Sequence, residues 1–554
     1  MNKLFIKLCC TICITLTCNM VAFSEESYTG FSQNLKLFND VFKTLYINYA
    51  DTIDAEKSIN TAINAMLKEL APYTTLFKNT EDYRQFNTGK YGGVGCTHMV
   101  RDSNLYCSGI MEGYPAHKAG LKPGDQIIAI DNDSVGNVNL DEISNKIRGE
   151  AGTNVSLTIK RPYTTDSILT LNITRGTIAP IIVPYHGVIY GDIGYIKLDE
   201  FKEDSYNLVK KHLLEFKNNP NVKSIIIDLR SNPGGQVNSC VDLISLFMPK
   251  NTLVMQSKGK GDIVLDEYKT QKKPVDTEIP LAILINNSSA SASEVFSGTI
   301  QDYDRGIIVG QRSFGKGLVQ SSFKTANDTY LKVTTAKYYL PSGRLIQALD
   351  YFHKSPDGKV TIVADSLTSV YKTKNGREVR DGRGITPDVT VEIKDNSKIA
   401  IALYYGHHFF DYANYFAATH PSIVAAEDFV ITDSIFNDFK NFINVDKIKY
   451  DKKCEEMLTS LAKIAEEEGY MTDSIKSHID ALKELLKHDI YKDIDNNRKE
   501  IEELLAIEIA ERYYFSRGII GVNIKSDDDI IEAVKILHDP QRYKSILKPQ
   551  NNKK

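Results

Sequence analysis

Short apolar runs alternate with helical segments in the middle of the chain, and this alternation most constrains what the chain can fold into. Between residues 181 and 392, segments with helical spacing occur at Tyr206–Phe216 and Ser293–Gln301. The runs suited to buried strands are Gly194–Leu198, Ser224–Leu229, Leu281–Ile285 and Gly306–Val309. Strands that alternate with helices predict a layered α/β core.

The rest of the chain differs in pattern, and 554 residues are too many for one hydrophobic core. Apolar residues recur at helical spacing between 25 and 90. Residues 91–178 carry short alternating strands with two short helices, residues 179–395 form the α/β core, and residues 396–554 are mostly helical. The content of 42% hydrophobic and 25% charged residues is typical of a globular protein, and the net charge of −4 gives no electrostatic footprint for nucleic acid.

Residues 1–24 resemble a secretory signal. Lys3 and Lys7 precede an apolar stretch over residues 8–23, and Ala22-Phe23-Ser24 is a small-x-small cleavage site. The stretch is shorter than the roughly 20 apolar residues of a membrane span. We therefore expect a cleaved signal and an exported, periplasmic protein. The alternatives are an uncleaved anchor, or a lipid on Cys18.

Four cysteines lie beyond the signal, namely Cys96, Cys107, Cys240 and Cys454. They are too few and too scattered for a disulfide scaffold or a zinc site, and no His-Glu-x-x-His motif is present. We expect no metal and no cofactor. Cys96 and Cys107 flank a turn. The sequence leaves two alternatives for this pair, a disulfide bond or two buried thiols.

The first segment that could carry chemistry is a run of small residues between a strand and a helix. It reads Asn-Asn-Ser-Ser-Ala-Ser-Ala-Ser-Glu over residues 286–294. The free N–H groups of a helix start stabilise an anion, so Ser291 is well placed as a nucleophile. The alternative is a capping box, in which Ser291 and Glu294 only begin the helix.

A serine nucleophile needs a base, and no histidine lies in a suitable setting. The best candidate is Lys316, which lies among glycines and apolar residues after another strand. Burial would lower its pKa and leave part of the amine neutral, and Gln320 could hold the amine by a hydrogen bond. The alternatives are an ordinary surface lysine and a P-loop, but Gly317 replaces the hydroxyl residue that a P-loop requires.

The third segment is a Pro-Gly-Gly turn at the end of an expected strand, over residues 228–235. It is either a plain turn or part of an oxyanion hole. In the second interpretation an N–H group of Gly234 or Gly235 acts together with that of Ala292.

Together the three segments resemble the carboxy-terminal processing peptidases. The resemblance rests on Ser291-Ala-Ser-Glu, on Phe-Gly-Lys316-Gly with Gln320, and on the segment 229–235. The 25 residues from Ser291 to Lys316 and the 4 from Lys316 to Gln320 follow the family pattern, and further matches lie at 339–344 and 384–388. The resemblance implies a crotonase- or Clp-protease-like α/β peptidase core and a serine endopeptidase with a Ser–Lys–Gln mechanism.

The stretch before the core resembles the PDZ domain of that family, a small β-barrel with two helices. Gly92-Gly93-Val94-Gly95 resembles its carboxylate-binding loop, and residues 115–125 resemble its signature turn. Free N–H groups in such a loop capture a C-terminal carboxylate, and the next strand can pair with the peptide. The implied partners are proteins or peptides with free apolar C-termini, while a homo-oligomer or an adaptor is left open.

Two other functions share this pattern. One is a PDZ scaffold on an inactive peptidase fold, and the other is a retinoid- or lipid-binding relative of the same core. The intact Ser–Lys–Gln set argues against both.

Overall fold

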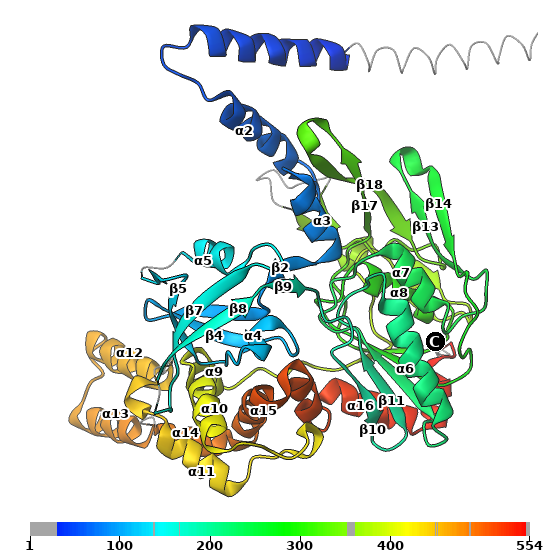
Figure 1. The fold of residues 1–554 in the computed structure, drawn as a ribbon. Coiled ribbons are helices and arrows are strands. Elements are labelled where there is room, and N and C mark those ends of the chain that lie inside the picture. The colour runs from blue at the N-terminus through cyan, green and yellow to red at the C-terminus, as the bar shows by residue number, and fades with distance from the viewer. Residues whose placement is uncertain are drawn as a thin grey trace, which may run out of the picture. The chain divides into compact units, whose positions relative to one another are not determined.

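The computed structural model describes residues 30–136, 139–165, 167–351, 360–448, 450, 453–486 and 489–549 (Figure 1). The expected signal at residues 1–24 lies outside the described residues. The chain divides into two compact units, and the boundary in the sequence falls between Thr75 and Leu76. Strand β1 (Thr75–Phe77) lies at this boundary.

The described part of the first unit is helical, as the spacing of its apolar residues predicts. One helix covers residues 30–48, and α2 covers Ala55–Lys68. The Asp54 side chain caps α2 by accepting the N–H of Lys57 at 3.0 Å.

The second unit begins with α3 (Thr80–Thr88) and continues into a small antiparallel domain with its own core. Five of its strands form a sheet in the order β3-β4-β5-β7-β8, β6 pairs with β5, and β2 pairs with β9. The elements are β2 (Tyr91–Gly93), β3 (Cys96–Arg101), β4 (Asn104–Ile110), α4 (Pro115–Lys118), β5 (Gln126–Ile130), β6 (Asp133–Ser134), α5 (Leu140–Ile147), β7 (Asn154–Lys160), β8 (Ile168–Thr174) and β9 (Gly176–Ile178). Cys96 and Cys107 are both free thiols.

The α/β core is built on a six-stranded sheet in the order β10-β11-β12-β15-β16-β23. The edge strand β10 runs antiparallel to β11, and the remaining neighbours are parallel. The strands are β10 (Tyr185–Ile189), β11 (Ile193–Lys197), β12 (Ser224–Asp228), β15 (Leu281–Ile285), β16 (Ile307–Gly310) and β23 (Val389–Thr390). The four strands predicted from the sequence are thus β11, β12, β15 and β16.

Both faces of this sheet are buried, which explains why its strands are continuous apolar runs. Ile225 and Ile227 face a core that includes residues of α6 (Ser205–Asn218), α7 (Val237–Ile244) and α8 (Ala292–Asp302). Ile226, between them, faces the opposite core. The residues that fill this second core from outside the sheet come mainly from α16 (Asp528–Leu537) and α17 (Pro540–Ile546), and Figure 1 shows α16 beside β10 and β11.

A second sheet extends from the core and carries the segment that follows Lys316. It includes the strands β13 (Leu253–Lys258), β14 (Val264–Lys269), β17 (Leu318–Lys324) and β18 (Tyr330–Tyr339), with β18 between β17 and β13, and β1 also pairs with β18. Short elements follow: β19 (Leu349–Asp350), β20 (Thr361–Ile362), β21 (Val370–Lys372) and β22 (Glu378–Arg380).

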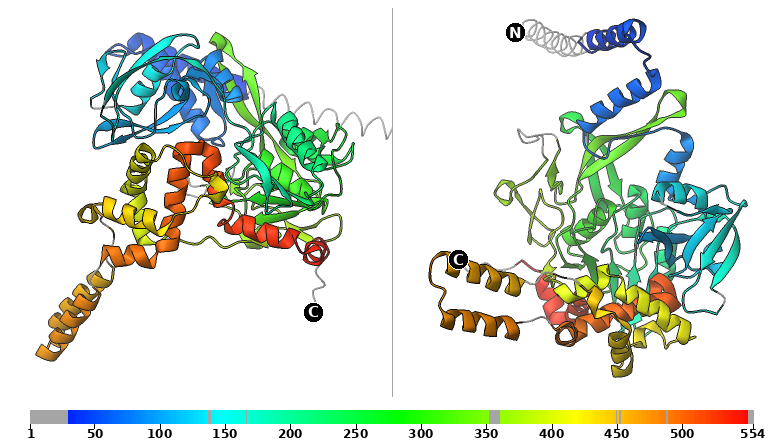
Figure 2. Two further views of the ribbon diagram at one scale, coloured as in Figure 1. Left: turned by 60° about the horizontal axis from the view of Figure 1, so that its bottom comes forward. Right: turned by 90° about the vertical axis from the view of Figure 1, so that its left-hand side faces the viewer.

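The C-terminal region is helical, as predicted, but its helices belong to two different cores. A separate hydrophobic cluster joins residues 399–509, whereas α16 and α17 pack on the α/β sheet. The other helices are α9 (Lys398–Tyr405), α10 (His408–Thr419), α11 (Asp433–Phe442), α12 (Lys453–Glu467), α13 (Asp473–Leu485), α14 (Ile490–Asn496) and α15 (Arg498–Asn523). Helices α12 and α13 lie side by side as a hairpin (Figure 2). Within the described ranges, no helix has the length and apolar character needed to cross a membrane.

Candidate active site

The three segments singled out in the sequence follow three neighbouring parallel strands. The Pro-Gly-Gly turn follows β12, the small-residue run follows β15, and the Lys316 segment follows β16. The carboxyl ends of parallel strands lie at one edge of a sheet, where α/β proteins bind ligands. The topology therefore brings the three segments together.

Ser291 is the residue immediately before α8, and its backbone is strained. Its φ of 55° and ψ of −114° lie outside the regions that a non-glycine residue normally adopts. Such strain persists only where the surroundings impose it, and it is concentrated at functional sites. The Ser291 side chain is partly exposed, so a substrate can reach it.

The neighbouring hydroxyls of Ser289 and Ser293 have structural roles. Both residues are fully buried. The Ser289 hydroxyl donates to the Leu229 carbonyl at 2.8 Å, and the Ser293 hydroxyl donates to the Asn232 carbonyl at 2.9 Å. These bonds attach the small-residue run to the Pro-Gly-Gly turn. Of Ser289, Ser291 and Ser293, Ser291 is therefore the best-placed candidate for a nucleophile.

Glu294 links the nucleophile segment to the Lys316 segment. Its fully buried carboxylate accepts the backbone N–H groups of Ser291 at 2.8 Å and Lys316 at 2.8 Å, both on Oε2. Its Oε1 accepts the Gly315 N–H at 2.6 Å and the Ser313 hydroxyl at 2.5 Å. Burial raises the pKa of Glu294 although all four hydrogen bonds favour the carboxylate. The expected capping role is thus only part of what Glu294 does.

Lys316 combines partial burial with a lowered pKa. Burial, assisted by the charge of Lys332, lowers the pKa of Lys316 to about 8, while the charge of Glu294 acts in the opposite direction. Phe314, which we expected to help bury the amine, is 44% exposed, whereas Leu318 is buried. The Tyr338 hydroxyl lies within hydrogen-bonding distance of the carbonyl oxygens of both Ser291 and Lys316, and so holds the two residues together from another side.

Gln320 lies on β17, four residues after Lys316. Its side-chain amide donates to the Leu318 carbonyl at 3.3 Å. The expected role of Gln320 in orienting the Lys316 amine stays a prediction. The strand that follows Lys316 also differs from the helix that must follow a P-loop, which removes the nucleotide-binding alternative.

The Pro-Gly-Gly turn packs directly against Ser291. A Cβ atom on Gly234 would lie 2.8 Å from both the Ser291 Cβ and the Ala292 nitrogen, so only glycine fits there. The Gly234 N–H donates to Asn232 Oδ1 at 2.8 Å. In the described part of the chain the N–H groups of Gly235 and Ala292 have no acceptor, so of the three N–H groups expected in an oxyanion hole these two are available to a ligand.

Arg230, in the same turn, is held by three carboxylates. It contacts Asp228 at 2.6 Å, Asp527 at 2.7 Å and Asp529 at 3.0 Å. Burial opposes ionisation of Asp228, but the charges of Arg230 and Lys197 outweigh it and hold the pKa of Asp228 at about 2. The start of α16 is therefore attached to the turn beside Ser291.

The segment predicted to bind a peptide carboxylate is shorter than expected. Gly92 and Gly93 belong to β2 and pair with β9, so only Val94 and Gly95 form the loop before β3. Val94 is buried, and Gly95 has a φ of +80°. Strand β3 lies at the edge of its sheet, with one side open for a peptide strand.

The sequence did not indicate the roles that Glu294, Tyr338 and Asp527 have in this site. Glu294 was visible as half of a capping box and as the last residue of the Ser291-Ala-Ser-Glu motif, but not as a link to Lys316. Tyr338 and Asp527 come from a distant strand and the last helices, and no local pattern connects either residue to the nucleophile.

The fold and the site define a serine peptidase with an attached PDZ domain. Residues 192–360 match Peptidase family S41, residues 107–161 match a PDZ domain, and residues 399–537 match the C-terminal helical domain of probable PDZ-proteases. The carboxy-terminal-processing protease of Bartonella bacilliformis is 31% identical over 368 residues, which are 65% of this chain and 82% of that protein. The chain therefore belongs to the carboxy-terminal-processing proteases of family S41.

Two other similarities were found. A probable CtpA-like serine protease of Staphylococcus epidermidis is 32% identical over 319 residues, which are 56% of this chain and 63% of that protein. The solved structure of a photosystem II D1 C-terminal processing protease aligns with a TM-score of 0.37 and 23% identity, covering 63% of this chain and 85% of that chain.

Proposed function

We propose that this carboxy-terminal processing protease cleaves exported proteins by an acyl-enzyme mechanism, with Ser291 as nucleophile and Lys316 as general base. The observation that carries the proposal is the Glu294 carboxylate, which binds the backbone of both residues through one oxygen atom. A base must lie within hydrogen-bonding reach of its nucleophile. A shared anchor keeps the two backbones in a fixed relation.

In the proposed reaction, the neutral Lys316 amine takes the proton of the Ser291 hydroxyl as Oγ attacks the scissile carbonyl carbon. The N–H groups of Gly235 and Ala292 stabilise the oxyanion of the tetrahedral intermediate. The Lys316 ammonium then gives its proton to the leaving nitrogen as the C–N bond breaks. Water, deprotonated by the same amine, hydrolyses the acyl-enzyme and restores Ser291.

We further propose that the PDZ domain binds the free C-terminus of the substrate through Val94 and Gly95, with the peptide strand beside β3. The open side of β3 supports this. Export to the periplasm is supported by the signal pattern of residues 1–24. N-terminal sequencing of protein from the cell envelope would reveal a start after Ser24 if the signal is cleaved.

The test of the mechanism is peptide cleavage by the wild type and by Ser291→Ala, with Ser288→Ala as a matched control. Ser288 is exposed and lies in the same segment. We expect Ser291→Ala to lose at least about 10³-fold in kcat with an unchanged thermal midpoint, and Ser288→Ala to keep its activity. Residual activity in Ser291→Ala together with loss in Ser289→Ala or Ser293→Ala would assign the nucleophile elsewhere.

A further inference from the structure

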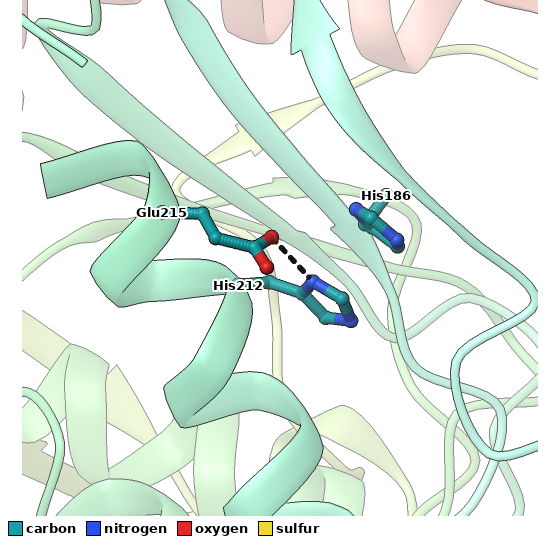
Figure 3. Close-up of side chains that lie close together, drawn as sticks. All are labelled: His186, His212 and Glu215. Atoms are coloured by element: carbon teal, nitrogen blue, oxygen red, sulfur yellow. Dashed lines mark hydrogen bonds and ion pairs between the residues drawn. The ribbon is translucent and has the colours of Figure 1, made fainter. Parts of the chain in front are cut away.

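Two histidines and a glutamate meet on the surface of the peptidase core, on elements that carry none of the proposed catalytic residues. His186 lies on the edge strand β10, and His212 and Glu215 lie on α6 (Figure 3). One donor atom from each residue lies within 4.8 Å of the other two. From this arrangement we propose that His186, His212 and Glu215 bind a divalent transition-metal ion of the zinc type.

The residue types suit such an ion. Two imidazoles and one carboxylate are a ligand set found in zinc sites that keep further positions for water. His212 and Glu215 are three residues apart on a helix, a spacing that puts both side chains on one face. The second imidazole reaches them from a different element, so binding would join β10 to α6.

The distances also suit a shared ion. His212 Nδ1 lies 3.0 Å from Glu215 Oε2. Two ligands bonded to one zinc ion at about 2.0–2.1 Å lie roughly 3.0–3.4 Å apart. The pair is therefore spaced for coordination once the ion replaces the proton of this hydrogen bond, which is released to solvent. The His212 ring is held in place because its side chain is only 8% exposed.

His186 becomes the third metal ligand if only its own imidazole ring rotates. The two imidazole rings are stacked, with centroids 3.5 Å apart and an angle of 20° between their planes, and Figure 3 shows them side by side. The nitrogen lone pairs lie in the planes of the two stacked rings, so they do not point at one shared position. The His186 ring must therefore turn to face the ion. Its residue is exposed, which leaves room for this turn.

The charge of the cluster favours a cation. Imidazoles bind metals in their neutral form, so two imidazole ligands and one carboxylate bring a net charge of −1 to the ion. Lys211 is the nearby cation that opposes binding.

The ion would add a link between α6 and the edge strand β10. Strand β10 is the first strand of the peptidase core, and within the described residues its backbone pairs with β11 alone in this sheet. A ligand that binds only the folded state raises the thermal midpoint, and the increase grows with the logarithm of the free ligand concentration relative to Kd. The expected consequence is a more stable core in the presence of zinc, with Ser291 and Lys316 unchanged.

The experiment is a titration of the chelator-treated full chain with Zn²⁺ by calorimetry, with the thermal midpoint as a second measurement. The variants are His186→Asn and Glu215→Gln, whose residues are both exposed and therefore tolerate substitution. His478→Asn, at an exposed position on α13, is the matched control.

We expect one Zn²⁺ to bind the wild type and His478→Asn and to raise the thermal midpoint of both proteins. Affinity should fall at least about tenfold in His186→Asn and in Glu215→Gln. Co²⁺ should give visible absorption bands with the wild type that both ligand variants lack. The absence of zinc binding, or undiminished affinity in either ligand variant, would overturn the three-ligand site.

Discussion

The peptidase site and the PDZ loop both present backbone N–H groups next to glycines, but the two are fixed by different means. Around Ser291, the buried side chains of Glu294, Ser289 and Ser293 tie together segments that follow three strands. The PDZ loop consists of Val94 and Gly95 between two strands of one small domain. In the proposed function, bond cleavage thus requires several segments held in register, whereas capture of a carboxylate requires only a short loop.

This difference predicts that variants of the peptidase site lower kcat for every substrate. Variants of the PDZ loop should instead change KM, and only for substrates that have a free C-terminus.

The largest effect in this comparison is expected for Lys316→Arg. A guanidinium stays protonated and cannot accept the Ser291 proton, so kcat should fall at least about 10³-fold. Lys324→Arg, at an exposed position on β17, is the control and should retain activity. Substantial cleavage by Lys316→Arg would exclude the lysine as general base.

The wild-type pH profile tests the same residue without a substitution. The base must be neutral, and the pKa of Lys316 is lowered to about 8, so about one amine in ten is neutral at pH 7. We expect kcat/KM to rise with pH through about 8 and then to level off. A profile that is flat between pH 6 and 9, or that falls over this range, would contradict a lysine base.

The next largest effect is expected for Glu294→Gln, because this carboxylate orders both catalytic segments. A glutamine presents an NH₂ group to donors that need an acceptor, so either Ser291 and Lys316 or Ser313 and Gly315 lose their partner. Misplacement of a catalytic group by about 1 Å can cost roughly 10²-fold in rate.

We therefore expect kcat for Glu294→Gln to fall about 10²-fold, with little change in KM. Glu278→Gln, at an exposed position, is the control. A wild-type kcat in a folded Glu294→Gln protein would show that the shared anchor is not needed for catalysis.

A smaller effect is expected from the far end of the chain, through the contacts of Arg230 with Asp527 and Asp529. The double variant Asp527→Asn/Asp529→Asn removes two charges but keeps a good capping residue at the start of α16. We expect kcat to fall about tenfold, because the turn beside Ser291 loses two of its three anchors. Asp528→Asn, whose aspartate pairs with the exposed Lys394, is the control. A drop in Asp528→Asn equal to that of the double variant would point to a general charge effect instead.

The sequence predicted the four parallel strands, and therefore the edge at which the three proposed catalytic segments follow them, because buried parallel strands leave continuous apolar runs, such as Leu281–Ile285. It also predicted the helix starts, for example that of α8 after Ser291. It did not reveal the role of Glu294 as a shared anchor. The four donors that meet on this carboxylate come from two segments about 20 residues apart, and their convergence depends on the packing of β15 beside β16.

The sequence also did not predict the surface on which α16 and α17 pack. The spacing of Ile530, Ala533 and Val534 indicates an apolar helix face, but it does not say which surface the face covers. In the structure that surface is the peptidase sheet. The family match to a C-terminal helical domain over residues 399–537 therefore includes a helix that completes the core of the peptidase.

The smallest effect is expected at the PDZ loop and depends on the substrate. A peptide with a free apolar C-terminus should be cleaved with a KM about three- to tenfold lower than the same peptide with an amidated end. The loop N–H groups form charge-assisted hydrogen bonds only with the carboxylate, while the amide keeps a weaker neutral bond.

In Gly95→Ala a Cβ atom would lie 2.6 Å from the Tyr114 Cβ, so the loop must shift and the preference for the free end should disappear. Gly136→Ala, which has open space around it, should keep the preference. The measurement is kcat and KM for both peptides with the three proteins. If amidation changes kcat and leaves KM unaltered, the carboxylate is bound at the peptidase site. The proposed division of roles between the peptidase site and the PDZ loop would then be wrong.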